Sequence, residues 1–199
     1  MYGHPKHLMS DLDARGALRA FDRFALLVTP DLAVTHLPFL VDGDRLIGHV
    51  ARANPHWRSA PCDALVVMAG AEAYVSPNWY PSKAAHGRAV PTWNYATLHV
   101  RGTLTTFDDA ARLEDVVARL SARFEARERK PWTIAEAPRD YIDTLLAGIV
   151  GVELAIVSVE GKRKLSQDRT EADVAGVIAG LEATGDARDE AVAETMREV

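Results

Sequence analysis

The feature that most constrains the fold is a series of short apolar segments in the first half of the chain, separated by turn residues. Several are rich in Val, Leu and Thr, which favour strands. Residues of turn type separate them, and the Asp42-Gly43-Asp44 run is the clearest hairpin signal because Gly43 tolerates positive φ. Short strands at this spacing favour a barrel or sandwich over a parallel sheet with crossover helices. The expected strands are 25–29, 32–37, 46–51, 64–69, 73–76 and 98–105, with further turns at Pro30-Asp31, Ser59 to Pro61 and Gly70.

The second half of the chain is mainly helical by pattern. Residues 108–127 carry apolar side chains at three- and four-residue intervals after a capping Asp, which predicts an amphipathic helix. A short helix is expected at 138–148, a strand at 152–159 ending in a polar turn at 160–162, and a helix through 174–181 that Gly185 ends. The charged residues 186–199 predict a tail helix, either frayed or docked on a partner, after a domain of residues 1–185.

Composition narrows the class of protein. With 48% hydrophobic and 26% charged residues, the 199-residue chain is typical of a globular domain with its own core. The single Cys62 excludes an internal disulfide, and no apolar run resembles a signal peptide or a membrane span, so we expect a cytoplasmic protein without membrane contact. A formal net charge of −5 opposes diffuse attraction to nucleic acid.

The sequence lacks the motifs of several common nucleotide-binding and catalytic sites. The chain has no G-x-G-x-x-G fingerprint, no phosphate-binding P-loop, no G-x-S-x-G elbow and no C-x-x-C pair. His4 and His7 lack a neighbouring carboxylate or thiol, so we expect no metal site. Cys62 is followed by Asp63, whose charge raises a thiol pKa, so a reactive thiol is not expected.

Five segments combine aromatic, amide and cationic residues with Gly or Pro more densely than core strands require. In chain order they are THLPFL, GHVARANPHW, YVSPNWYPSK, VPTWNYATLHVRG and GKRKLSQ. Together they resemble the PaiB-type FMN-binding negative transcriptional regulator family, over roughly residues 1 to 181. The resemblance implies an α+β, mainly β fold: an antiparallel six-stranded split β-barrel of Greek-key type with peripheral and C-terminal helices, related to pyridoxamine-phosphate oxidases and flavin reductases. It also implies a homodimer with FMN between the subunits.

The phosphate and the ring of FMN need different partners, and these needs indicate which residues of the motifs could bind it. The phosphate needs cationic or hydrogen-bond donors, for which Arg52, Asn54 and His49 are the first candidates, although Arg52 also suits a surface cation. The ring needs an apolar face and donors, which Thr92, Trp93 and Asn94 offer, with Trp93 equally suited to capping a core. Lys162, Lys164, Ser166 and Gln167 could reach ring or phosphate from either subunit, although a Lys-Arg-Lys run is ordinarily a solvated hairpin end. Thr35 and His36 complete the cofactor-binding candidates, with His36 also suited to a structural role in a strand.

Two positions depart from the family pattern. Asp168 stands where members commonly have Asn, which places a carboxylate beside the candidate C-terminal contacts. Leu8 stands where many have an aromatic residue, a change expected to affect packing alone.

Three functions remain open from the sequence. The first is an FMN-dependent oxidoreductase acting with a small-molecule donor or substrate, in which no side chain is assigned as catalytic acid or base. The second is a negative transcriptional regulator using FMN as ligand or redox signal; direct DNA binding has weak support because no helix-turn-helix with a basic face is visible. The third is a haem-binding relative on the same barrel, with His36, His49 and His99 as the available ligands.

Overall fold

The computed structural model describes residues 1–198. The chain forms two compact units. The terminal unit consists of Met1–Arg15, Ala69–Leu98 and the residues from Glu160 on, and the central unit of Gly16–Met68 and His99–Val159. Three long strands contribute residues to both units: β5 (Cys62–Val75), β6 (Thr92–Phe107) and β7 (Ile149–Lys164).

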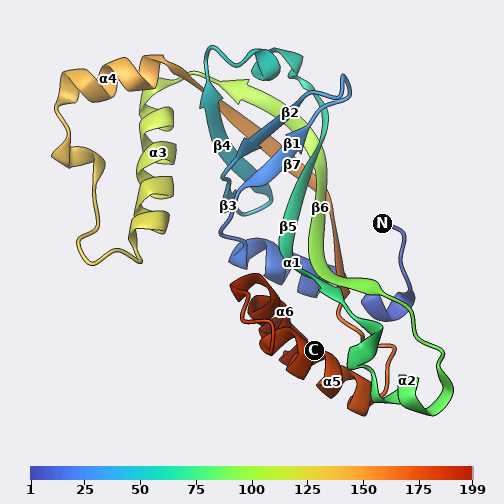
Figure 1. Ribbon diagram of the computed structural model, residues 1–199. Coiled ribbons are helices and arrows are strands. Elements are labelled where there is room, and N and C mark those ends of the chain that lie inside the picture. The colour runs from blue at the N-terminus through green and yellow to red at the C-terminus, as the bar shows by residue number, and fades with distance from the viewer. Residues whose placement is uncertain (199) are drawn as a thin grey trace. The chain divides into compact units, whose positions relative to one another are not determined.

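The strands form one antiparallel sheet in the order β2-β1-β5-β6-β7-β4-β3 (Figure 1). The shorter strands are β1 (Ala25–Val28), β2 (Val34–Leu37), β3 (Leu40–Asp42) and β4 (Arg45–Ala51). The α+β class is therefore confirmed, with seven strands where six were expected. The Greek-key connection stays a prediction.

The hairpin at Gly43 is confirmed, and it accounts for a strand that the sequence did not predict. Gly43 has φ +58°, and Asp42 pairs with Arg45 across the turn. Leu40 and Ile47 pair on the same hairpin and are both buried. The sequence pattern does not predict a strand at Leu40, which lies at the end of an aromatic and proline segment, and β3 is therefore a feature that the structure adds.

Gly70 does not form the predicted turn; β5 runs straight through it. A Cβ atom at Gly70 would lie 3.1 Å from the Cβ of Ala96 on neighbouring β6. Glycine here allows two strands to approach closely, which is the other common use of a strand glycine. The two predicted strands 64–69 and 73–76 are therefore one.

The predicted polar turn at Glu160-Gly161-Lys162 is also wrong, because β7 continues to Lys164. The N-terminal segment supplies a backbone partner: Met9 N–H donates to the Gly161 carbonyl at 3.0 Å, and Leu8 forms a bridge with Lys162. A Cβ atom on Gly161 would lie 2.4 Å from the Met9 sulfur. A contact between distant parts of the chain thus extends a strand that local sequence would end.

The predicted helices are confirmed with shifts of a few residues at their ends. Asp109 caps α3, its carboxylate accepting the Arg112 N–H at 2.8 Å. The helices are α1 (Asp11–Ala20), α2 (Pro81–His86), α3 (Ala110–Glu125), α4 (Arg139–Ala147), α5 (Glu171–Glu182) and α6 (Ala187–Arg197), with 3-10 turns η1 (Pro5–His7), η2 (Pro55–Ser59), η3 (Pro77–Trp79) and η4 (Ile134–Glu136). The sequence pattern predicted neither α1 and α2 nor the 3-10 turns.

Each unit has its own core. In the central unit, Ile47 and Leu40 pack with Val116 and Leu120 of α3. In the terminal unit, Val177 and Leu181 of α5 share a cluster with Val192 and Met196 of α6, so the charged tail packs within its own chain rather than fraying. None of the helices within residues 1–198 is long and apolar enough to cross a membrane.

Candidate functional site

The predicted site residues fall into one group in each unit. Thr35, His36, His49, Arg52 and Asn54 belong to the central unit. The other seven lie in the terminal unit: Thr92, Trp93, Asn94, Lys162, Lys164, Ser166 and Gln167.

In the central unit, Thr35 and Asn54 meet at the buried imidazole of His56. Asn54 Nδ2 donates to Thr35 Oγ1 at 3.0 Å, and that hydroxyl lies 2.7 Å from His56 Nδ1. On the other side of the ring, His56 Nε2 lies 2.7 Å from Thr29 Oγ1, which donates to the carboxylate of Asp31. Because the Thr29 hydrogen points to Asp31, Thr29 accepts from His56, and the proton of the neutral ring resides on Nε2.

These hydrogen bonds fix the orientations of the His56 ring, the Thr35 hydroxyl and the Asn54 amide. His56 Nδ1 is left as an acceptor for the Thr35 hydroxyl, and Thr35 in turn accepts from Asn54. Burial is the largest influence on the pKa of His56 and lowers it, although the charge of Asp31 opposes the shift. The ring is therefore a neutral, fixed connection that orients Thr35.

Sequence reasoning missed His56 as a site residue, although its local signal was present. Pro55 begins the short turn η2, and the Asn54 side chain caps it by accepting the His56 N–H at 3.0 Å. An Asn-Pro-His sequence thus fixes the backbone before the imidazole, but the partners Thr29 and Asp31 come from a different part of the chain.

Four of the five central candidates line one polar hollow of about 350 Å³, namely Thr35, His36, His49 and Asn54. Arg52 lies outside this lining, and its guanidinium donates to two backbone carbonyls, Ala147 at 2.9 Å and Ile149 at 3.0 Å. These bonds tie β4 to the end of α4 and the start of β7. A phosphate contact from Arg52 stays a prediction.

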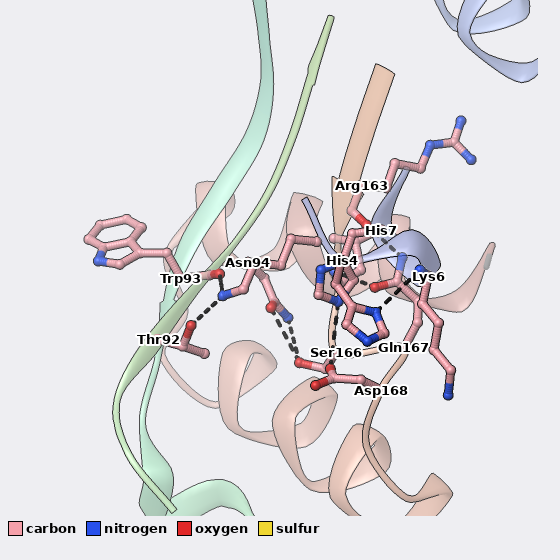
Figure 2. A network of polar contacts seen from close by, with 12 residues as sticks. His4, Lys6, His7, Thr92, Trp93, Asn94, Arg163, Ser166, Gln167 and Asp168 are labelled. Atoms are coloured by element: carbon pink, nitrogen blue, oxygen red, sulfur yellow. Dashed lines mark hydrogen bonds and ion pairs between the residues drawn. The ribbon is translucent and has the colours of Figure 1, made fainter. Parts of the chain in front are cut away.

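In the terminal unit, Lys164 connects the β7 motif to the β6 motif. Its ammonium group donates to the Thr92 hydroxyl and, at 2.6 Å, to the Trp93 carbonyl (Figure 2). Burial, with Lys162 and Arg169 adding to it, lowers the pKa of Lys164, while Tyr95 and Asp168 oppose the shift. An ammonium group has three N–H donors, so one remains for a ligand.

Asn94 and Ser166 form a buried pair behind this lysine. The Asn94 amide donates to the Ser166 hydroxyl at 3.1 Å, and the hydroxyl lies 3.2 Å from the Asn94 carbonyl oxygen (Figure 2). Gln167 closes the same turn by accepting the Leu165 N–H and donating to the Arg163 carbonyl. These side chains hold Ser166 at φ +67°, a strained backbone for a residue other than glycine. Direct flavin contacts from Asn94, Ser166 and Gln167 stay predictions.

Exposed aromatic rings stand beside the lysines. Trp93 is 52% exposed and meets Tyr74 edge to face at 6.2 Å between ring centroids. Trp93 and Tyr95 share one face of β6 by alternation, and the Lys162 ammonium lies 5.3 Å from the centre of the Tyr95 ring. Trp93 is therefore not a core cap, and the Lys-Arg-Lys run is not a solvated hairpin end.

These residues meet the chemical demands of FMN. Lys162 and Lys164 are cations suited to a phosphate, and the exposed Trp93 ring offers an apolar surface for a planar heterocycle. The second Asn54 amide hydrogen and the second Thr35 lone pair add polar contacts in the central unit. The terminal unit is thus suited to a planar, anionic ligand, and the central unit separately offers donors and acceptors for polar ligand groups.

Asp168, one of the two residues that differ from the family pattern, contacts a buried histidine. Its carboxylate lies 3.6 Å from Nε2 of the buried His7, and the His4 ring packs 5.4 Å from the His7 ring. Burial lowers the pKa of His7 most strongly, and Asp168 opposes that shift.

The pKa of the Cys62 thiol is raised, as the sequence predicted. Burial is the largest cause, and the charges of Asp31 and Asp63 add to it.

Comparison with known protein families shows to which family the chain belongs. The family described as "Putative FMN-binding domain" matches residues 1–158. The chain belongs to this FMN-binding family. It is 31% identical over 170 residues to the Bacillus subtilis protease synthase and sporulation protein PAI 2, covering 82% of this chain and 79% of that protein. An uncharacterised protein of Emericella nidulans is 29% identical over 207 residues, covering 85% of this chain and 82% of the relative.

Solved structures share the fold of this FMN-binding family member at low sequence identity. The flavocytochrome Anf3 of Azotobacter vinelandii aligns with a TM-score of 0.60 and 14% identity, over 88% of this chain and 78% of its own. An FAD- and haem-binding protein of Mycobacterium smegmatis aligns with a TM-score of 0.54 and 19% identity, over 81% and 77%. These similarities establish the split-barrel type of fold.

Proposed function

We propose that this protein binds FMN and uses it in redox chemistry with a small-molecule partner. The observation that carries the proposal is membership of the FMN-binding family across residues 1–158. The cationic and aromatic surface formed by Lys162, Lys164, Tyr95 and Trp93 supports it, because the surface provides both charge and ring contacts. FMN, when bound, supplies electron or hydride transfer.

In this proposal each part of the chain has a binding or orienting role. Lys164 would contribute its remaining N–H to an anionic group, while Thr92 and the Trp93 carbonyl hold the ammonium in place. Asn54 and Thr35 would orient polar ligand groups, with His56 fixing the Thr35 hydroxyl. We also propose a homodimer with FMN between subunits, as in the family that the motifs resemble.

A regulatory role is the second candidate. It is supported by the 31% identical Bacillus relative, whose name links that protein to protease synthesis and sporulation. The net charge of −5 argues against direct contact with DNA and favours regulation through a ligand or partner. In this role FMN would act as ligand or redox signal.

The proposal is tested by absorbance and FMN titration of the purified protein, followed by sizing chromatography. A flavin spectrum retained at dimer mass is expected. Lys164→Met should weaken FMN binding about 10-fold or more, because a hydrogen bond to a charged group contributes about 1.5–3 kcal/mol. Trp93→Ala should also weaken FMN binding, because it removes the exposed ring on which the flavin would pack. Lys130→Met, at an exposed lysine of the central unit, is the matched control and should leave FMN binding unchanged.

The other outcomes separate the alternatives. Absence of measurable FMN affinity would refute flavin binding and leave the regulatory candidate without its flavin ligand. A Soret band after haem addition, lost on replacing His36, His49 or His99, would favour the haem-binding reading instead.

A further inference from the structure

A second, apolar cavity lies in the central unit between strand β4 and the helices α3 and α4. Its volume is about 260 Å³. Its walls come from five secondary-structure elements and the loop at Trp132, and they are apolar apart from the His49 imidazole and the indole N–H of Trp132. The lining residues are His49, Val117, Trp132, Ile134, Ile142, Leu145, Leu146 and Ile149.

The position of His49 on β4 explains why an imidazole lines an apolar wall. Ile47 packs in one cluster with Val116 and Leu120 of α3. Side chains two residues apart on a strand share a face, so His49 also faces the helices. Its Nδ1 atom is buried and has no hydrogen-bond partner among residues 1–198.

An unpartnered buried nitrogen is costly, and its surroundings restrict what can pair with it. Leaving such a group unsatisfied costs about 1–3 kcal/mol. Burial lowers the pKa of His49, so the ring is neutral near pH 7. A neutral ring offers one hydrogen bond at Nδ1 but no charge, and the remaining lining residues would not solvate an ion.

We propose that this cavity binds a small, uncharged, hydroxylated aromatic molecule of the phenol class, with its hydroxyl group bonded to Nδ1 of His49. A hydroxyl fits whichever ring nitrogen carries the proton, because it can donate or accept. A cavity of about 150 Å³ holds benzene, so 260 Å³ accommodates one aromatic ring with a short substituent.

Binding of this aromatic molecule does not require FMN. It gives His49 a role other than the phosphate contact expected from the sequence. His49 lines the apolar cavity as well as the polar hollow that Asn54 and Thr35 line, and a neutral imidazole is a poor partner for a phosphate. In this proposal His49 therefore recognises the aromatic ligand through its unpartnered Nδ1 atom.

Three probes of similar shape test the chemistry: 4-ethylphenol, ethylbenzene and 4-ethylbenzoate. Binding is measured by calorimetry on the full chain, together with ¹⁵N chemical shifts of the histidine rings. We expect 4-ethylphenol to bind at one site and to shift the Nδ1 resonance of His49. Ethylbenzene should bind about 5- to 10-fold more weakly through loss of one buried hydrogen bond, and 4-ethylbenzoate should not bind.

Variants locate the site. Leu145 is 49% exposed, so Leu145→Trp should fill the cavity mouth without unfolding the protein and should abolish binding of both neutral probes. Tyr141→Trp, at an exposed position of the same helix outside the lining, is the matched control and should leave binding unchanged. His49→Leu should reduce the preference for 4-ethylphenol over ethylbenzene to less than twofold.

Equal affinities for 4-ethylphenol and ethylbenzene in the wild type would overturn the proposal, as would binding that survives Leu145→Trp in a folded protein. If Leu145→Trp instead changes the oligomeric mass and leaves probe binding intact, the face is a contact between copies and the proposal is wrong. FMN titration of the same samples reports separately on the flavin proposal, so either can fail alone.

Discussion

The Nε2 atom of buried His7 lies 3.6 Å from a carboxylate oxygen of Asp168, which is 44% exposed. The contact connects the N-terminal turn η1 with the residues that follow β7 (Figure 2). Burial favours the neutral imidazole, and the carboxylate favours the protonated one. The protonation of His7 therefore depends on the balance between these two influences.

Replacing Asp168 with Asn should lower the pKa of His7 further. The change removes the negative charge that stabilises the imidazolium and leaves the burial that opposes it. An NMR pH titration of the His7 ring measures the shift. Asp140→Asn, at an exposed carboxylate of the central unit, is the control, and a His7 pKa that stays constant in D168N would contradict this account.

Stability should fall as pH decreases below about 6.5. Burial lowers the pKa values of His7, His49 and His56 from the ordinary value of 6.5, so the unfolded chain takes up protons first as acid is added. The stability that these histidines contribute is thus fully present above about pH 6.5. It is lost as the pH falls from there toward the folded pKa values, by at most about 1.4 kcal/mol per pH unit for each histidine. Urea unfolding between pH 5 and 8 measures the slope, and a flat profile would show that these rings are not held neutral.

Thr35→Val should destabilise the central unit by about 1–3 kcal/mol, because it removes the hydroxyl that His56 Nδ1 and Asn54 Nδ2 both use. Valine keeps the shape and strand preference of threonine. Thr106→Val, on an exposed position of β6, should change the free energy of unfolding by less than about 0.5 kcal/mol. Similar effects from the two substitutions in urea titrations would argue against the network.

Two helical glycines should respond to alanine in opposite directions. A Cβ atom at Gly180 in α5 would lie 2.3 Å from the Trp79 ring, whereas one at Gly16 in α1 meets nothing within 4 Å. Gly16→Ala should stabilise by about 0.5–1 kcal/mol through helix propensity, and Gly180→Ala should destabilise by about 1–3 kcal/mol through overpacking. Thermal unfolding of both variants measures the difference; stabilisation by Gly180→Ala would mean that α5 does not pack on Trp79.

The sequence by itself determined features that depend on neighbouring residues. Asp109 caps α3 and Gly43 turns the β3–β4 hairpin, because capping and positive φ are properties of a few adjacent residues. The ordered motifs also determined the family, since five short segments in one order are specific without any knowledge of their contacts.

Tertiary structure alone decided features that need distant partners. Strand β7 extends past Gly161, where Met9 supplies a backbone partner, and β5 passes through Gly70, where a Cβ atom would lie 3.1 Å from the Cβ of Ala96. The proton position on His56 follows from Thr29 and Asp31, and the titration of His7 follows from its burial and from Asp168. Desolvation and long-range hydrogen bonding depend on which segments meet in space, and no window of neighbouring residues contains that information.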